Sequence, residues 1–148
     1  MFVEHKWEKR MLQIAKVVAT FSKDPSTQVG AVIYNPERRT IITTGYNGFP
    51  RGTRDDAAIY EDREQKYPRV VHAEANAIVE AASQGISTAG SYLATTHTPC
   101  ANCAGLLIQA GITSIFYEET GDTMERLGGN MARDMLKEAC VPVIGITL

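Results

Sequence analysis

The chain has 148 residues, 44% of them hydrophobic and 22% charged, with a formal net charge of −2 at pH 7. This length suits one domain with a buried core and is short for two, so we expect residues 1–148 to form a single domain. The slightly acidic balance argues against a nucleic-acid partner, whose binding surface is normally basic. No segment approaches the roughly 20 apolar residues of a membrane span, so no membrane partner is expected.

Residues 1–10 carry mixed charge around Trp7 and lack the apolar run of a secretion signal. Three cysteines do not make a disulfide framework. Both observations favour a reducing, cytoplasmic location.

The first predicted elements are one helix and two strands. The helix is predicted over residues 4–21. It ends at residues 22–25, Ser-Lys-Asp-Pro, because proline disfavours helical backbone in the residue before it. Residues 29–34 and 40–44 read as strands joined by a hairpin-type connection over 35–39. Over residues 4–21, apolar side chains at spacings of three and four indicate one helical face, made by Trp7, Met11, Ile14, Val18 and Phe21.

A sharp turn, Gly45-Tyr46-Asn47-Gly48-Phe49-Pro50, opens a long polar segment that extends to about Arg69. A structureless connection of this length inside a compact domain is usually functional. A disordered surface loop is the alternative interpretation.

The second half of the chain alternates helices and strands. Helices are predicted over 73–84, from Thr98 and Pro99 to Gly111, and over 122–137, the last opened by Asp122 and Glu125 as a capping box. Strands are predicted over 91–96, 112–117 and 141–146, the last at a sheet edge because it contains Pro142. The fold class is therefore α/β, with a five-stranded mixed sheet covered by helices on both faces.

The sequence His72-Ala73-Glu74, followed by Pro99-Cys100 and Cys103, contains the residue types of a catalytic zinc site. One imidazole and two thiolates suit Zn²⁺, and three protein ligands leave the fourth tetrahedral position for water. Zinc lowers the pKa of that water to roughly 7. Glu74 is then available as the general acid–base. This spacing is the signature of zinc deaminases of nucleobases.

Each half of the motif alone is weak, since C-x-x-C also occurs in structural zinc sites and redox pairs. His97, three residues before Cys100, is the one competing ligand, and we interpret it instead as a strand-end residue lining a pocket. Cys140 is expected to be a small buried hydrophobe. Cys100 and Cys103 should lie in the first helical turn, where the helix dipole favours thiolates.

The chain resembles the deoxycytidylate deaminase family of the cytidine deaminase superfamily. The resemblance covers most of residues 7–117. Besides the zinc motifs, it rests on Trp7-Glu8, Ser22-Lys23-Asp24-Pro25, Gln28-Val29-Gly30-Ala31, the Gly45–Pro50 turn, residues 72–78 and Gln109-Ala110-Gly111-Ile112.

This resemblance implies an α/β/α sandwich of cytidine deaminase type. It also implies a homo-oligomer, a hexamer or smaller, that converts dCMP to dUMP and ammonia for thymidylate synthesis. Some family members carry a second zinc with ligands in the long loop. Between Gly48 and Val71 this chain has neither Cys nor His, so one Zn²⁺ per chain is expected.

The resemblance also implies roles for individual residues. Asn47 matches the position that binds the nucleoside sugar, and Ser22, Lys23 and Ala73 fall where the substrate approaches. Where some members place a tyrosine near the substrate phosphate, this chain has Glu118 and Glu119. Their carboxylates would repel a phosphate, so the phosphate contacts are expected from Lys23, Arg51 and Arg54.

Activation by dCTP and inhibition by dTTP are implied near the turn and a subunit boundary, with Gly45, Tyr46, Gly48 and Arg51 as candidate allosteric residues. Arg51, Arg54, Arg63 and Lys66 are expected to meet the triphosphate, with Mg²⁺ offsetting its charge. Three alternatives remain: a deaminase of another cytosine nucleotide, a deaminase of tRNA adenosine, and a non-catalytic zinc domain. The acidic balance and the turn weigh against a tRNA substrate, and Glu74 weighs against a non-catalytic site.

Overall fold

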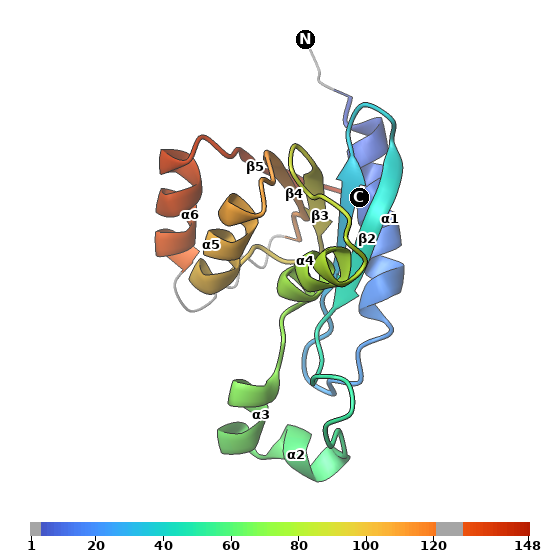
Figure 1. Ribbon diagram of the computed structural model, residues 1–148, viewed down its shortest axis with the longest axis vertical. Helices are drawn as coiled ribbons and strands as arrows, with labels where there is room; N and C mark the ends of the chain where they lie inside the picture. The colour runs from blue at the N-terminus through green and yellow to red at the C-terminus, as the bar shows by residue number, and fades with distance from the viewer. Residues whose placement is uncertain (1–3, 121–128) are drawn as a thin grey trace.

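The computed structural model describes residues 4–120 and 129–148 (Figure 1). A central sheet separates helix α1 from a second layer of helices. In chain order the elements are α1 (Lys6–Ala19), β1 (Gly30–Asn35), β2 (Thr40–Tyr46), α2 (Ala57–Glu61), α3 (Arg63–Arg69), α4 (Ala73–Ser83), β3 (Tyr92–Thr95), α5 (Ala101–Gln109), β4 (Ser114–Glu118), α6 (Gly129–Glu138) and β5 (Val143–Ile146).

The five strands form one mixed sheet in the order β2-β1-β3-β4-β5. β1 pairs antiparallel with both β2 and β3. β3, β4 and β5 run parallel, joined by the α5 and α6 crossovers. The prediction of a five-stranded mixed sheet with helices on both faces is confirmed, and β5 lies at the edge that Pro142 predicted.

Strand β1 divides the core into two clusters because its side chains alternate between the two faces of the sheet. Ala31 and Ile33 face a cluster shared with α4, α5 and α6. Val32 and Tyr34 face a cluster shared with α1. A strand buried on both faces reads as a continuous apolar run, which is what residues 31–34 show.

Two glycines let helices approach the sheet at backbone distance. A Cβ at Gly30 would collide with the carbonyl of Ala15 in α1. A Cβ at Gly45 would collide with the backbone of Ala73 and Ala77 in α4. Gly45 therefore determines how closely the helix that begins after His72 packs on β2.

Helix α1 buries a face that differs from the predicted one. Met11 and Val18 are buried as expected, but Ile14 and Phe21 are exposed. Leu12 and Ala15 take their places in the core. The prediction counted only large apolar residues and so missed the small Ala15, which the close approach at Gly30 requires.

The polar segment after the turn is predicted to be structureless. In the structure it contains the two short helices α2 and α3. Asp62 caps α3 by accepting a hydrogen bond from the Glu64 amide. Phe49 and Tyr60 stack with ring centroids 4.2 Å apart. Both helices extend beyond the end of the sheet, at the bottom of Figure 1. They are too short, at five and seven residues, for periodicity to reveal them.

Two predictions in the second half of the chain are wrong. Helix α5 begins at Ala101 with Cys100 at the N-cap, so Thr98 and Pro99 precede the helix. Cys140 is exposed, in the turn after α6, with a φ of 58°. The prediction of a buried position failed because Cys140 lies in this exposed turn and not on a helix or strand face. The predicted capping residues Asp122 and Glu125 lie outside the described residues.

None of the helices within residues 4–120 and 129–148 has the length and apolar character that crossing a membrane requires.

Candidate active site

His72, Cys100 and Cys103 converge at the starts of two neighbouring helices. His72 is the N-cap of α4, Cys100 is the N-cap of α5, and Cys103 lies in the first turn of α5. His72 Nδ1 is 3.4 Å from the Sγ atom of each cysteine. In a tetrahedral site with Zn–S and Zn–N bonds of about 2.3 and 2.0 Å, sulfur and nitrogen lie about 3.5 Å apart. The three side chains are therefore spaced to hold a zinc ion.

The two thiols share their protons unequally. Hydrogen bonds from Cys103 and from His72 lower the pKa of Cys100 to about 3. The bond to Cys100, together with burial, raises the pKa of Cys103. The Ala75 amide at the start of α4 donates to Cys103 Sγ. Zinc binds cysteine as the thiolate, so its binding here would release any proton that remains on the two thiols.

Glu74 lies beside this cluster and is fully buried. It occupies the first turn of α4, where the positive end of the helix dipole favours a carboxylate. The Thr95 hydroxyl lies 3.3 Å from Glu74 Oε1 and 3.0 Å from the carbonyl oxygen of His97. Glu74 is thus placed close to the metal-binding side chains by its helix and by the end of β3.

His97 Nδ1 lies 3.2 Å from Thr96 Oγ1. Within the part of the chain that the structure describes, the group of side chains close enough to share a metal ion is His72, Cys100 and Cys103, without His97.

Asn47 is buried and holds the loop between α1 and β1 in place. Its Oδ1 accepts from the Val29 amide at 2.8 Å, and its Nδ2 donates to the Thr27 carbonyl at 2.9 Å. The Ser22 hydroxyl donates to the Asn47 carbonyl at 2.8 Å. The structure therefore brings together Asn47 and Ser22, two of the four predicted substrate-binding residues. An amide oxygen can accept two hydrogen bonds, so Oδ1 retains capacity for a ligand hydroxyl.

The residues flanking Asn47 attach to helix α4. Gly48 and Val71 exchange two backbone hydrogen bonds of 3.1 and 2.8 Å. Asn76 Nδ2 donates to the Tyr46 carbonyl at 2.7 Å. Asn47 is therefore fixed next to the chain segment that leads directly into His72.

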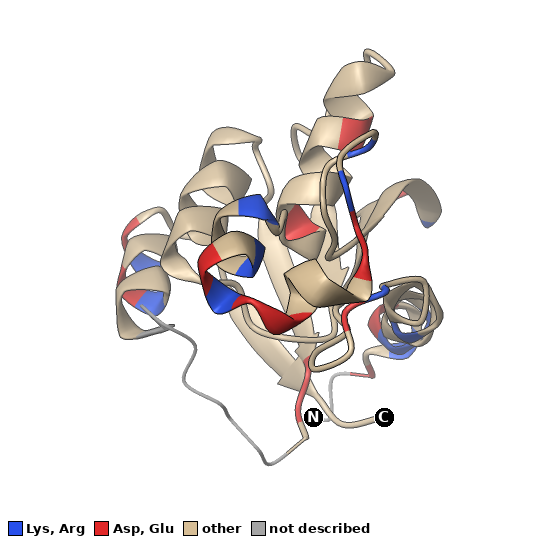
Figure 2. Cartoon of the chain, turned by 90° about the horizontal axis from the view of Figure 1, so that it is seen from below, with Lys and Arg blue, Asp and Glu red and all other residues tan. Residues whose placement is uncertain are grey.

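The predicted phosphate-binding cations are paired with carboxylates. Lys23 contacts Asp55 at 2.6 Å, which raises the pKa of Lys23 by hydrogen bonding and charge. Basic and acidic residues lie next to one another in the view from below (Figure 2). A phosphate would have to displace these carboxylates. The other two pairs are Arg51 with Glu80 at 2.9 Å and Arg54 with Asp56 at 2.7 Å.

Lys66, a candidate for the triphosphate, is buried, unlike these three exposed cations. Its ammonium group lies inside, 3.0 Å from Asp24 Oδ1 and 2.8 Å from Ser26 Oγ. Sequence reasoning missed Asp24, Ser26, Asn76 and Thr95 as parts of the site. The proline after Asp24 was interpreted only as a helix stop, and the other three occur in ordinary polar contexts.

A histidine and two cysteines at helix starts could hold one metal ion, with a buried carboxylate beside them. The family model of the cytidine and deoxycytidylate deaminase zinc-binding region matches residues 5–119. The chain therefore belongs to the cytidine and deoxycytidylate deaminase family, and it is a hydrolytic deaminase.

Individual relatives agree with this assignment. The chain is 42% identical to an uncharacterized deaminase of the luxG 3′ region of Aliivibrio fischeri, over 97% of this chain and 95% of the relative. It is 38% identical to human deoxycytidylate deaminase, over 86% and 76% of the two chains. The crystal structure of dCMP deaminase from the cyanophage S-TIM5, in complex with dCMP and dUMP, superposes with a TM-score of 0.80. It shares 27% identity and covers 98% of this chain and all of that chain.

Proposed function

We propose that this protein hydrolyses dCMP to dUMP and ammonia and so supplies dUMP for thymidylate synthesis. The observation that carries the proposal is the His72–Cys100–Cys103 cluster beside the buried Glu74. Similarity to deoxycytidylate deaminases over most of the chain supports dCMP as the substrate.

In this proposal His72, Cys100 and Cys103 hold one Zn²⁺ per chain. When bound, zinc acts as a Lewis acid that makes water nucleophilic at neutral pH. Glu74 accepts the first proton of the attacking water and delivers it to the ring nitrogen of cytosine. It then takes the second proton, from the hydroxyl group now bonded to the ring carbon, and passes it to the amino group, which leaves as ammonia while the carbonyl of uracil forms. Its burial keeps bulk water away from these transfers.

The substrate contacts follow from the residues around the cluster. Asn47 Oδ1 accepts a sugar hydroxyl, and Ser22 keeps the Asn47 backbone in place for it. The Ala73 amide is among those that helix geometry leaves without an intrahelical acceptor, so it can donate to the substrate. Lys23, Arg51 and Arg54 are the candidates for the phosphate, after exchange of their carboxylate partners.

An ultraviolet absorbance assay with dCMP, deoxycytidine, dCTP and CMP tests the substrate proposal. Rapid conversion of dCMP alone is the expected result. Preference for deoxycytidine or CMP would replace dCMP as the substrate, and inactivity toward all four would refute the proposed function.

Regulation by dCTP and dTTP belongs to the same proposal, with Tyr46, Gly48 and Arg51 near the effector and Mg²⁺ on its phosphates. Gly45 would transmit a conformational change at the effector site to α4, because it packs against the backbone of that helix. A ligand shifts an equilibrium only by its difference in affinity between two states. Therefore dCTP should lower, and dTTP should raise, the dCMP concentration that gives half-maximal rate. Kinetics unaffected by either would remove the regulation and leave the deaminase proposal intact.

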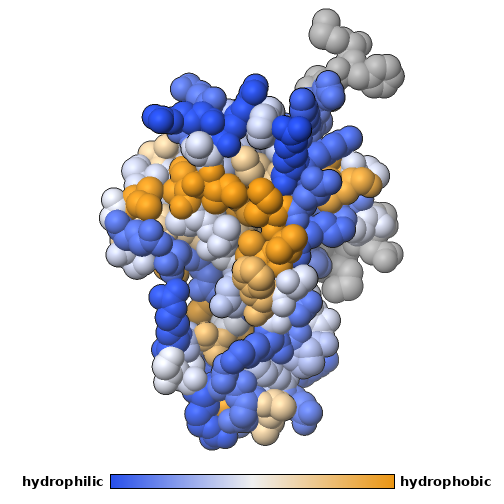
Figure 3. Space-filling model, turned by 90° about the vertical axis from the view of Figure 1, so that its right-hand side faces the viewer, coloured by the Kyte–Doolittle hydropathy of each residue, from blue (hydrophilic) through white to orange (hydrophobic). Residues whose placement is uncertain are grey.

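We also propose that the protein is a homo-oligomer and that it is located in the cytoplasm, where reducing conditions preserve the zinc thiolates. An apolar strip crosses the face seen in Figure 3. The exposed apolar side chains of α1, of the turn after it and of β2 include Val17, Phe21 and Ile41. Contiguous exposed apolar surface commonly marks a protein interface. Sedimentation equilibrium tests this, since a monomer at micromolar concentration would contradict it.

A further inference from the structure

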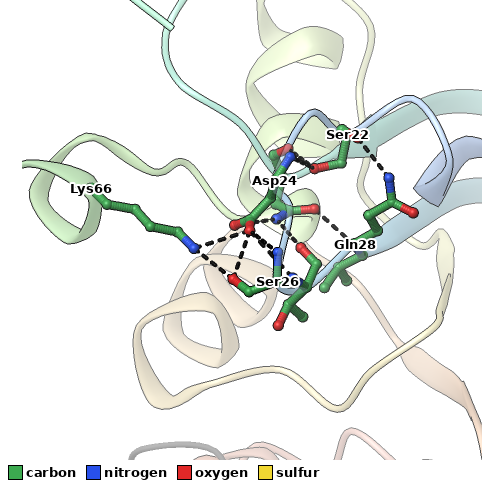
Figure 4. A network of polar contacts seen from close by, with 8 residues as sticks. Ser22, Asp24, Ser26, Gln28 and Lys66 are labelled. Atoms are coloured by element: carbon green, nitrogen blue, oxygen red, sulfur yellow. Dashed lines mark hydrogen bonds and ion pairs between the residues drawn. The ribbon is translucent and has the colours of Figure 1, made fainter. Parts of the chain in front are cut away.

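Lys66 forms a buried ion pair with a residue that lies far from it in the sequence. It is 9% exposed, comes from α3, and contacts Asp24 in the loop between α1 and β1 (Figure 4). Asp24 is 6% exposed. A buried charge requires a partner, because leaving it unpaired costs far more than the pair itself contributes. The pair therefore ties α3 firmly to this loop.

Asp24 organises the loop from within. Its Oδ1 accepts from the Ser26 amide and the Ser26 hydroxyl, both at 2.9 Å, and from the Thr27 amide at 3.3 Å. Gln28 closes the loop by donating to the Ser22 carbonyl at 2.8 Å. The same carboxylate thus accepts from the loop and from Lys66, so the loop's shape and the position of α3 depend on each other.

The network continues from this loop to Asn47. Asn47 Nδ2 lies 3.5 Å from Asp24 Oδ2 and donates to the Thr27 carbonyl. The Gly48–Val71 bridge then leads to the N-terminus of α4. A continuous set of contacts therefore joins Lys66, Asp24 and Asn47 to the start of the zinc-binding helix.

We infer that Lys66 is a positioning residue for nucleotide binding: α3 holds the 22–28 loop and Asn47 in the arrangement that accepts the substrate sugar. The substrate part of this inference rests on the proposed function. The Lys66 ammonium contacts Asp24 and Ser26 and is not among the residues of the metal cluster. In this inference it therefore acts on the affinity for the nucleotide and leaves the chemical step unchanged.

Lys66→Met tests the inference, with Lys16→Met as the matched control. Lys16 also forms an ion pair, with Glu118 of β4 at 2.9 Å, but it is exposed and its partner lies outside the 22–28 loop. If the variant loop is binding-competent a tenth of the time, the KM for dCMP rises about tenfold. We expect this rise with kcat and zinc content unchanged, and no rise for Lys16→Met. A fall in kcat and zinc content without a rise in KM would overturn the inference.

Amide hydrogen exchange is a second test of the positioning role, and it requires no substrate. In Lys66→Met the amides of Ser26, Thr27 and Val29 should exchange faster, because their acceptors lie in the network. The amide of Ala104 in α5 should remain as protected as in the original chain. Unchanged exchange at all four amides overturns the positioning role even if dCMP proves not to be the substrate.

Two further variants cover the case in which Lys66→Met does not fold. Ser26→Ala removes one acceptor from Lys66 and one donor to Asp24 while keeping the ion pair, and it should shift KM and exchange in the same direction by less. Asp24→Asn with Lys66→Met removes both charges, so it should be more stable than Lys66→Met alone. Ser26→Ala behaving like the original chain in both measurements would contradict the inference.

Discussion

The metal-binding cluster and the loop around Asp24 lie close together but are built differently. In the cluster every ligand stands at a helix start, so two short motifs carry all the required residue types. In the loop, Asp24 is completed by Lys66, 42 positions further along the chain. Chemistry that is fixed by local helix geometry can be recognised in a sequence. Substrate positioning that depends on distant contacts cannot.

Removing a metal ligand should have the largest effect. Cys103→Ala leaves two protein ligands where the site provides three, so we expect loss of both bound zinc and activity. Metal analysis of the purified variant measures this. Cys140→Ala is the matched control, because Cys140 is exposed and outside the cluster, and it should retain zinc and rate. One zinc per chain in Cys103→Ala would show that the cluster is assigned incorrectly.

Glu74→Gln should separate chemistry from metal binding. Zinc and fold should be retained, while kcat falls by about 10²–10⁴-fold, the range typical of general acid–base catalysis. Steady-state kinetics together with metal analysis decides this. Near-normal turnover would exclude Glu74 as the proton carrier.

Gly45→Ala tests how far the cluster depends on packing that its motifs do not encode. The added methyl group would push α4 away from β2, and such overpacking costs about 1–3 kcal/mol of unfolding free energy. Urea denaturation measures it. Gly105→Ala, where a Cβ meets only the Met135 side chain at 3.6 Å, should be neutral or stabilising, since alanine favours helix. Equal stability of the two variants would contradict the close approach.

The smallest effect concerns pH and the loop. Burial works to raise the pKa of Asp24, but hydrogen bonds from Ser26 and from Lys66 outweigh it and leave that pKa lowered. The ionised carboxylate therefore stabilises the fold above the unfolded-state pKa of about 4, and this contribution is lost as pH falls through the lower folded-state value. Urea midpoints between pH 6 and pH 3 should fall less steeply in Asp24→Asn. Parallel curves would show that Asp24 titrates alike in both states.

The sequence predicted much of the fold because its signals are local. These signals, each set by neighbouring residues, are the continuous apolar run of β1, the alanine-rich sequence of α4 and the proline directly before β5. Predictions failed where tertiary context decides. Ile14 fits the helical period of α1 yet is exposed, because Gly30 draws the small Ala15 against the sheet. Cys140 has an apolar side chain, but it occupies a left-handed turn position.

The candidate site divides in the same way. Residue type and spacing predict His72, Glu74, Cys100 and Cys103, and the structure brings the histidine and the two cysteines together. Lys66 was expected to face an effector because it lies in a charged segment. No local feature of that segment indicates that one cation folds inward.

The Gly48–Val71 bridge has a consequence for the segment that it encloses. Its two hydrogen bonds hold the ends of that segment together, so residues 48–71 form a closed loop whose ends are fixed. The entropy of closing a flexible loop grows slowly, and doubling its length costs only about 0.6 kcal/mol. Of this segment, residues 51–56 are exposed and lie before α2, so an insertion there would leave the Asp62 cap and the Lys66 contacts of α3 in place.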